Sequence, residues 1–413
     1  MLGHMRISPF QGLRPTRETA AKVASLPYDV VSTEEARALA AGNPLSMLHV
    51  VRAEIDFPEG QDPYADAVYA KAVANFQKLQ DEKALVRESA PCLYLYQQQM
   101  GDHVQRGIVA VCQVEDYENN LIKKHEKTRQ AKEDDRTRLT SDLSANSGPV
   151  FLTFRDEAAI GKAIDEIAKG EPLFDFTAPD AIRHTVWQIP GGEDLVEAFK
   201  PVQAFYVADG HHRSASAARV GRERAKVNPN HTGAEAYNQF MAVIFPASEL
   251  KILPYNRLVH KFPEGLDAKS FLAKLQEKVK VVSGATDTPS GSNDCRMYFE
   301  GQWYQILFEE KPELDPVAAL DVSRLQDEVL QPFFGIDDPR TSDDISFVGG
   351  IRGTSYLKKE VDAGNAIAAF SLYPVTCDQL MAIADAGQIM PPKSTWFEPK
   401  LRSGLFIHTF ENL

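Results

Sequence analysis

The chain alternates short apolar runs with segments that carry an apolar residue every three or four positions. The short runs predict buried strands, and the wider spacing predicts amphipathic helices. The expected strands are 93–96, 107–114, 149–154, 185–189, 205–207, 239–245, 366–372 and 405–408, with a hairpin over 296–307. The expected helices are 33–41, 66–82, 157–168 and 322–330.

The helix at 33–41 has the clearest local signals. Ser32 and Glu35 form an S-x-x-E capping box at its start, in which each side chain bonds a backbone N–H of the other residue. Gly42-Asn43-Pro44 follows it and predicts its end.

Short strands and separated helices, without a regular strand–helix alternation, favour an α+β fold with a mixed sheet over a doubly wound parallel sheet. A length of 413 residues indicates two or three domains. We expect an N-terminal α/β segment over 1–90 packed on a core at 91–250, and a C-terminal α+β domain over 251–413.

The charge and the cysteines exclude several classes of protein. The net charge is −13 and the pI about 5.3, so nucleic acid is not expected as a partner. The four cysteines are widely separated, which fits a reducing, cytoplasmic location. No apolar run is long enough to span a bilayer, so no membrane partner is expected, and residues 1–6 have no signal-peptide core.

One turn concentrates residues that bind anions. An apolar run ends at Asp209-Gly210, and an alanine-rich segment follows His211-His212-Arg213-Ser214, which predicts strand, turn and helix N-terminus. Helix N-termini attract anions. Gly210 permits close approach, while His211, His212 and Arg213 can donate to phosphate. Asp209 can hold Mg²⁺ or accept a proton, or it can simply cap the helix.

A second polar stretch, 122–138, has two interpretations. It can be a solvated helix with charge pairs four residues apart. Alternatively, it is a loop over an anionic ligand, in which lysines and arginines neutralise phosphate and His125 or Glu126 acts as a base. The residues that would surround the ligand are Lys123, Lys124 and Arg129.

A third stretch, 390–400, is stiffened by prolines on both sides. Lys393 and Thr395 can contact an anion there. The alternative is a rigid surface loop whose Trp396 and Phe397 pack on the core. The chain has no P-loop, no G-x-G-x-x-G after a strand, no G-x-S-x-G and no H-E-x-x-H, so the familiar nucleotide, hydrolase and zinc-protease motifs are absent.

The turn at 209–213 resembles the phosphate-binding turn of the ParB and sulfiredoxin superfamily, which precedes an alanine-containing helix. More closely, its D-G-H-H-R letters are similar to those of the archaeal free serine kinase family. That family also has an upstream His-Glu pair, whose glutamate is taken as the base that activates the serine hydroxyl. The resemblance implies this role for Glu126, with His125 beside it.

Over nearly its full length the chain also resembles the family called "domain of unknown function 1015". The stretches that carry this resemblance are PFQGLRP, PYDVV, IKKHEKT, EDDRTR, GPVFLTF, ADGHHRSASA and MPPKSTWFEPK.

These resemblances imply a ParB/sulfiredoxin-like core and a nucleotide-dependent phosphotransferase. It would use ATP or ADP with Mg²⁺ and act on a small hydroxyl-bearing, serine-like metabolite, and it could form a homodimer. Glu126, His125 and Asp209 would be catalytic, and residues 210–214 would bind nucleotide. Two alternatives stay open: a nucleotide-binding regulatory protein without transfer activity, and a ParB-like nuclease, which the acidic charge disfavours.

Overall fold

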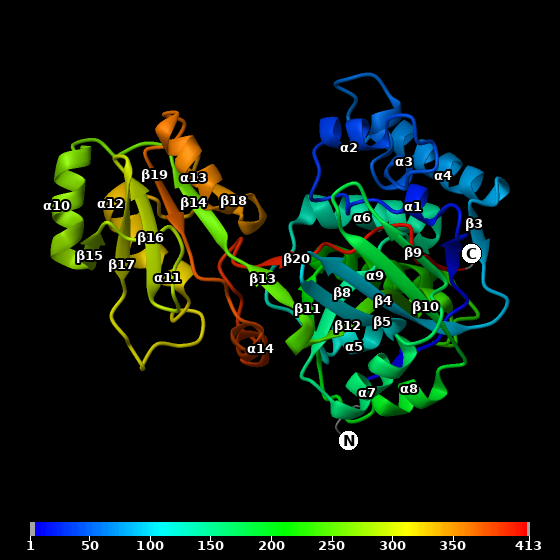
Figure 1. Ribbon diagram of the computed structural model, residues 1–413. Coiled ribbons are helices and arrows are strands. Elements are labelled where there is room, and N and C mark those ends of the chain that lie inside the picture. The colour runs from blue at the N-terminus through cyan, green and yellow to red at the C-terminus, as the bar shows by residue number, and fades with distance from the viewer. Residues whose placement is uncertain (1–4, 411–413) are drawn as a thin grey trace. The chain divides into compact units, whose positions relative to one another are not determined.

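The computed structural model describes residues 5–410 (Figure 1). Residues 1–4, which carry part of the expectation about a signal peptide, lie outside this range. The chain forms two compact units, the first comprising residues up to Leu250 and those from Pro399 onward, and the second Lys251–Glu398. The expected segment 1–90 and core 91–250 therefore share one unit, and the last residues of 251–413 belong to it as well. The three-part division remains a prediction.

A mixed nine-stranded sheet forms the centre of the first unit. Most neighbours are antiparallel, but β11 pairs with β6 and β12 with β8 in parallel. The strands, in their order across the sheet, are β6 (Ile122–Lys123), β11 (Phe205–Asp209), β8 (Val150–Phe154), β12 (Gln239–Pro246), β5 (His103–Gln113), β4 (Cys92–Met100), β10 (Arg183–Pro190) and β9 (Phe174–Thr177), with β1 (Ile7–Ser8) beside β5.

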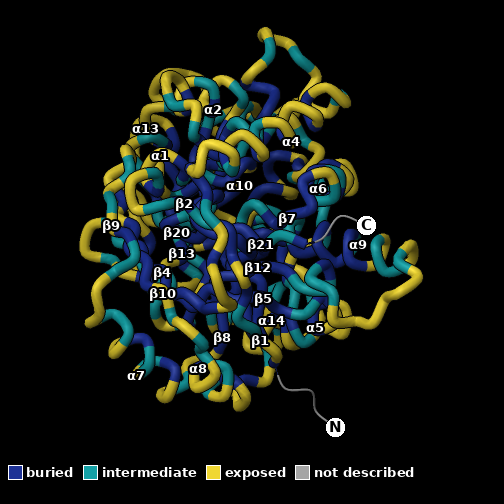
Figure 2. The backbone as a smooth tube through the Cα atoms, turned by 90° about the vertical axis from the view of Figure 1, so that its right-hand side faces the viewer, coloured by how far each residue is buried: buried dark blue, intermediate teal, exposed yellow. Residues whose placement is uncertain are grey.

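Helices cover one face of this sheet because alternate strand residues, such as Leu95, Ile108 and Ile244, are apolar and point toward them. Figure 2 shows the central strands β4, β5 and β12 as buried, and α7 and α8 as partly exposed. The helices that contribute to this core are α5 (Val114–Glu118), α7 (Ala158–Ile167), α8 (Glu193–Ala198) and α9 (His211–Val227).

The N-terminal helices form a second apolar cluster together with α6 (Gln130–Leu143). In Figure 1 they lie on the side of the sheet opposite α7 and α8. Their bounds are α1 (Ala20–Val23), α2 (Thr33–Ala40), α3 (Leu48–Val51), η1 (Ala53–Asp56) and α4 (Asp66–Asp81). The small sheets β2 (Leu13–Pro15) with β3 (Leu85–Arg87), and β7 (Ala145–Asn146) with β21 (His408–Thr409), join the remaining segments, and the short η2 (Ala236–Asn238) and η3 (Ala247–Glu249) flank β12.

The C-terminal segment returns to the first unit by packing aromatic side chains on the sheet. The ring of Phe406 lies 5.0 Å from that of Tyr94 and 5.5 Å from that of Tyr96. Aromatic pairs at this separation add to the free energy of burial. Residues 399–410 are thus fixed against β4, although little of this segment is a strand.

The second unit contains a six-stranded antiparallel sheet. Its order is β15 (Lys280–Ser283), β17 (Gln302–Leu307), β16 (Asp294–Phe299), β19 (Ala368–Ser371), β14 (Tyr255–Val259) and β18 (Ile345–Gly349), and β13 (Lys251–Leu253) pairs separately with β20 (Trp396–Glu398). Its helices are α10 (Ala268–Lys278), α11 (Asp321–Leu325), a wider π turn at Gln326–Leu330, α12 (Gln331–Phe334), η5 (Gly350–Arg352), α13 (Gly353–Asp362) and α14 (Cys377–Asp385).

The expected α+β class with a mixed sheet and a strand–turn–helix is confirmed. The capping box is confirmed too, since Ser32 accepts from the Glu35 N–H and Glu35 accepts from that of Ser32. The strand expected at 405–408 is found in its second half, where Ile407 bridges to Leu13 and His408 pairs with Asn146, whereas Leu405 and Phe406 are buried without strand pairing. Cys92, Cys112 and Cys295 are buried thiols. Within residues 5–410, no helix could cross a membrane.

Candidate functional site

Two loops meet at one edge of the large sheet because the strands that precede them are parallel neighbours. Phe205 of β11 pairs with Ile122 of β6, and Tyr206 pairs with Lys123. The carboxyl ends of β6 and β11 therefore lie at the same edge of the sheet. The loop after β6 carries His125 and Glu126, and the turn after β11 carries Asp209 and Gly210 and leads into α9. Parallel pairing therefore brings together two segments about 80 residues apart in sequence.

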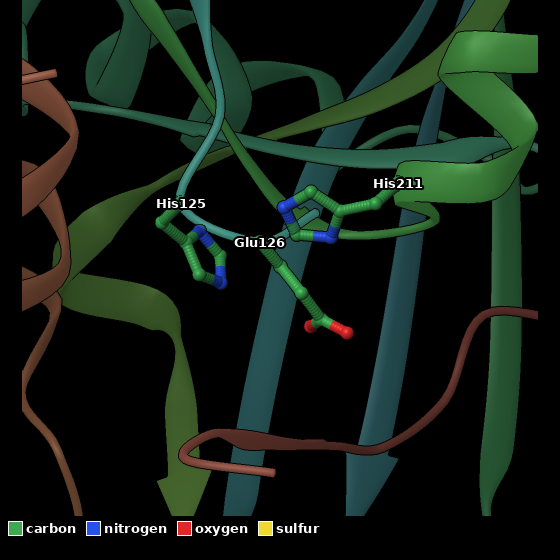
Figure 3. A group of neighbouring side chains, drawn as sticks. All are labelled: His125, Glu126 and His211. Carbon is green, nitrogen blue, oxygen red and sulfur yellow. The ribbon is translucent and has the colours of Figure 1, made fainter. Parts of the chain in front are cut away.

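His125, Glu126 and His211 form a compact cluster at this edge (Figure 3). Their nitrogen and carboxylate oxygen atoms lie within 4.8 Å of one another. The two imidazole rings meet edge to face, with centroids 4.5 Å apart. Both histidines are buried, whereas Glu126 is exposed. The cluster thus combines a solvent-accessible carboxylate with two buried imidazoles.

Both histidines are neutral at physiological pH. Burial lowers the pKa of His125 to about 4, against the opposing effects of the Asp209 carboxylate and the Val207 carbonyl. Burial also lowers the pKa of His211, and the neighbouring His125 lowers it further. Within residues 5–410, neither nitrogen of His125 nor the Nε2 atom of His211 has a hydrogen bond of ordinary geometry. A buried polar atom without a hydrogen bond lowers the free energy of unfolding by about 1–3 kcal/mol.

Asp209 is held by two donors. Its Oδ2 atom lies 3.1 Å from Lys400 Nζ, and its Oδ1 atom accepts from the Gly210 N–H at 2.8 Å. Burial raises the pKa of the Asp209 carboxyl, but Lys400 and Arg213 outweigh it, and the pKa lies below its usual value. Asp209 is therefore a carboxylate at neutral pH.

The start of α9 has the geometry of an anion site. Gly210 occupies the N-cap position with φ +93°, and no side chain caps the first turn of this helix. The simpler interpretation of Asp209 as a helix cap is therefore wrong, since Asp209 bonds the Gly210 N–H. The N–H groups of the first turn remain available to a ligand. A Cβ at position 210 would meet Arg213 Nε at 3.2 Å, so glycine also leaves room for the guanidinium group.

Arg213 joins this turn to a neighbouring cavity. Its Nη1 atom donates to the Pro149 carbonyl, while its Nε atom is buried without a partner in the described part of the chain. A Cβ at Gly148 would meet Ser403 Oγ at 2.9 Å, so glycine permits the close approach of two segments there. The polar residues that line the cavity together with Arg213 are Tyr28, Arg136, Thr140, Asn146, Ser147 and Ser403.

Arg136 makes the cavity basic and holds it in shape. Its guanidinium group lies 4.0 Å above the ring of Tyr28 and pairs with Asp135 at 2.7 Å. Tyr28 belongs to PYDVV, Arg136 to EDDRTR and Gly148 to GPVFLTF. These stretches, far apart in the sequence, converge with Arg213 on one cavity of the first unit.

His212 and Ser214 bond mainly within the protein. The His212 Nε2 atom accepts a hydrogen bond from the Arg129 N–H at 3.0 Å, which ties the 124–129 loop to α9. Burial lowers the pKa of His212, so the ring can accept. The Ser214 hydroxyl is fully buried and donates to the His211 carbonyl at 3.0 Å. Both residues can therefore position the turn.

The stretch 122–138 contains both a loop and a helix, and the loop's contact with an anionic ligand stays a prediction. Residues 124–129 form a loop, and α6 begins at Gln130. This helix is not only solvated, since Asp135, Thr137 and Leu139 are buried. Lys124 Nζ lies 4.0 Å above the Tyr117 ring and donates to the Tyr117 carbonyl, and burial lowers its pKa.

The other residues expected to contact substrate are dispersed. Lys123 is half-buried on β6, and the side chain of Arg129 is exposed at the start of α6. Lys393 and Thr395 belong to the second unit, where Lys393 Nζ lies 5.5 Å above the Tyr255 ring and its carbonyl accepts from Arg257. In the same unit Phe397 is buried and Trp396 packs against Tyr255, as the surface-loop interpretation of this stretch expects.

Asp209 does not suit a magnesium ion. Mg²⁺ requires oxygen ligands in near-octahedral geometry, usually from carboxylates and waters. Both carboxylate oxygens of Asp209 already accept from N–H groups, and the ammonium group of Lys400 would repel a divalent cation. The metal role given to Asp209 from the sequence is therefore disfavoured.

Lys400 was missed as a site residue. It lies in MPPKSTWFEPK, in which the sequence favoured Lys393 and Thr395. A sequence has no signal for a pair whose members are 191 residues apart. The only available indication was the presence of Lys400 in a stretch that carries the family resemblance.

The fold defines an α+β protein with a strand, a turn and a helix N-terminus at the edge of a mixed sheet. The sequence profile of a family described as "Protein of unknown function (DUF1015)" matches residues 7–323, and the chain belongs to this family. The expected membership is thus confirmed. Among curated proteins, no sequence matches the chain.

Several solved structures are similar at low identity. Free serine kinase in complex with AMP has a TM-score of 0.37 at 12% identity, over 72% of this chain and 91% of that one. A conserved hypothetical protein from Pyrococcus furiosus has a TM-score of 0.35 at 15% identity, over 71% and 93%. C-terminally truncated SbnI from Staphylococcus aureus has a TM-score of 0.38 at 12% identity, over 71% and 85%.

Proposed function

We propose that the protein is a nucleotide-dependent phosphotransferase that acts on a small, hydroxyl-bearing metabolite of the serine type. The observation that carries the proposal is the position of His125 and Glu126 beside His211, at the uncapped start of α9. A proton acceptor and an anion site then face the same space. Phosphoryl transfer needs mainly such positioning and charge neutralisation.

The phosphates of ATP or ADP would bind at the start of α9. The first-turn N–H groups and the positive end of the helix dipole favour a polyanion. Gly210 allows the phosphates to approach the backbone, and the two uncommitted groups that face them are His211 and the Nε atom of Arg213. His212 and Ser214 would keep the turn in place through their hydrogen bonds.

Glu126 would accept the proton of the substrate hydroxyl. The hydroxyl oxygen attacks the terminal phosphorus, the bond from phosphorus to the nucleotide breaks, and the proton passes to the Glu126 carboxylate. His125 would orient this carboxylate, because the neutral ring lies within 4.8 Å of it. Lys123, Lys124 and Arg129, on or beside the same loop, would attract the acceptor's carboxylate.

Asp209 would stabilise the turn and offset part of the positive charge of Lys400 and Arg213. Its ion pair with Lys400 fixes the carboxylate at the end of β11, and the positive charge of Arg213 also stabilises this carboxylate. Together, Asp209, Lys400 and Arg213 therefore carry more positive than negative charge close to the proposed phosphate site. The substrate-binding role of Lys393 and Thr395, which belong to the second unit, stays a prediction from the sequence.

The proposal is tested by turnover with defined acceptors. The full chain is incubated with ATP or ADP, Mg²⁺ and a panel of amino acids and hydroxy acids, and nucleotide consumption and product are measured by mass spectrometry. We expect acceptor-dependent consumption with a hydroxyl-bearing member of the panel. Nucleotide binding without turnover for any acceptor would reject transfer and favour the nucleotide-binding regulatory protein.

Arg213→Ala is expected to weaken nucleotide binding by about 10- to 100-fold, because charge-assisted hydrogen bonds to phosphate are lost. Isothermal titration with ADP measures the change. Arg222→Ala is the matched control, since Arg222 lies on the same helix but is half exposed and pairs with Glu118. Equal affinities in wild type and Arg213→Ala would contradict the assignment of the phosphate site.

A further inference from the structure

Three potential metal ligands converge where β6 and α9 meet. His125 and Glu126 are adjacent in one loop, and His211 is the first residue of α9. Their donor atoms lie within 4.8 Å of one another, and Figure 3 shows the Glu126 side chain beside the two rings. The three side chains thus enclose one small volume from two independent segments.

The histidines in this cluster lack the partners that buried imidazoles normally have. His125 is 2% and His211 6% exposed. Across residues 5–410, neither nitrogen of His125 nor the Nε2 atom of His211 makes a hydrogen bond of ordinary geometry. By contrast, buried His184 bonds Tyr96 through Nδ1 at 2.8 Å and Arg402 through Nε2 at 3.3 Å. Buried imidazole nitrogens that lack a hydrogen-bond partner and lie beside a carboxylate are typical of metal ligands.

The donor set selects the kind of ion. Two imidazoles and one carboxylate suit Zn²⁺ and Co²⁺, whereas Mg²⁺ prefers oxygen ligands alone. Bonds of about 2.0–2.1 Å in a tetrahedron hold the donors about 3.4 Å apart. The widest separation of 4.8 Å therefore has to shrink by at most about 1.4 Å. Changes in the side-chain torsions of exposed Glu126 can supply much of this movement.

We propose that His125, Glu126 and His211 bind a divalent ion of the zinc type, with a fourth position open to water or an anionic ligand. Three protein ligands with one open position are typical of zinc sites that bind substrate. The open position would face the N–H groups at the start of α9, so a phosphate or carboxylate could bridge ion and helix. This inference does not depend on phosphoryl transfer, because it concerns binding in the absence of nucleotide.

Metal binding by the full chain tests the proposal. The protein is treated with a chelator, dialysed against Zn²⁺ or Co²⁺ without nucleotide, and analysed by mass spectrometry for bound metal. We expect one equivalent per chain and, with Co²⁺, the visible absorption of a tetrahedral site. His211→Ala and His125→Ala should each lower the affinity more than about 100-fold, since loss of an outer partner alone costs about 10–100-fold.

His260→Ala is the matched control. Its ring nitrogens are already engaged, by the Asn365 carbonyl at 2.9 Å and by Ser346 at 3.0 Å, so this variant should bind metal like the wild type. Less than 0.1 equivalent bound to the wild type at micromolar Zn²⁺, or equal affinity in His211→Ala, would overturn the proposal.

X-ray absorption of the zinc-loaded wild type provides a test that does not depend on whether the variants fold. Two imidazoles among the nitrogen and oxygen ligands support the site, and a spectrum without imidazole overturns it. A metal site confirmed in a protein without transfer activity would reject only the proposed function. Turnover without metal binding would reject only this inference.

Discussion

Glu126→Gln is expected to lower the rate of phosphoryl transfer by about 10²–10⁴-fold, the usual contribution of a positioned general base. Glutamine keeps the size of the side chain but cannot accept the proton of the hydroxyl. Because Glu126 is exposed, the substitution should leave the fold intact. In protein freed of zinc-type ions, nucleotide affinity should stay within about twofold of the wild type, because the proposed phosphate contacts belong to α9. Turnover at saturating substrate and calorimetric ADP binding give the two quantities.

Glu166→Gln is the control for this prediction. Glu166 lies on α7 and forms an exposed pair with Lys169, so its loss should change neither rate nor affinity. If nucleotide consumption were the same in wild type and Glu126→Gln, the proton acceptor would have to be another group. A fall in nucleotide affinity without a fall in the rate at saturation would instead give Glu126 a role in binding.

Lys400→Met is expected to destabilise the first unit by about 2–4 kcal/mol. Removing one partner of a buried ion pair leaves an uncompensated charge, which usually costs about 3–5 kcal/mol. The side chains of Lys400 and Asp209 are 11% and 24% exposed, so water reduces this cost. Urea unfolding followed by circular dichroism measures the change. Lys78→Met, which removes an exposed pair with Glu82, should alter stability by less than about 0.5 kcal/mol.

The effect of Lys400→Met should depend on pH. In the wild type the Asp209 carboxyl has a pKa below its usual value, so the pair stabilises the native state at neutral pH. This contribution is complete above the ordinary pKa of about 3.9 and is lost as the pH falls toward the lowered native pKa. The stability difference between wild type and variant should therefore narrow below about pH 4. A constant difference from pH 7 to pH 3 would rule out the ion pair as its cause.

Asp209→Asn in the Lys400→Met background separates charge from packing. Asparagine keeps the acceptor for the Gly210 N–H and removes the unpaired charge. The double variant should recover part of the lost stability, because losing both charges costs less than losing one. Strict additivity of the two substitutions would contradict direct coupling of Asp209 and Lys400.

Local features of the fold were predictable where neighbours in sequence decide them. The Ser32 capping box needs only residues three apart, and the hairpin of β16 and β17 turns at Glu300-Gly301 as its sequence predicts. In the apolar run at 405–408 only Ile407 and His408 pair as expected, whereas Phe406 is buried by aromatic rings and not by strand pairing. Apolarity in a short run indicates burial without specifying what buries it.

The candidate site was predictable only in part, because some of its contacts join neighbours in sequence and others join distant segments. The turn at 209–213 was recognisable because strand, glycine and helix start follow one another directly. The ion pair of Asp209 was not predictable in this way, because its partner Lys400 belongs to the C-terminal segment. That partner turns a candidate metal ligand into half of an ion pair. Arg136 and Tyr28 likewise became visible as neighbours of Arg213 only through the folding of distant stretches around one cavity.

The sequence by itself determined the strand–turn–helix at 205–227, the α+β class and the kinds of side chain available for chemistry. These depend on periodicity, on glycine at a positive φ and on residue type, all of which are local properties. The tertiary structure decided which side chains meet. The parallel pairing of β6 with β11 places Glu126 and His125 beside His211. The C-terminal segment is held on the sheet by Phe406, which packs on Tyr94 and Tyr96. This packing brings Lys400 of the same segment next to Asp209. Such contacts follow from the burial of whole strands and segments, which no short stretch of sequence encodes.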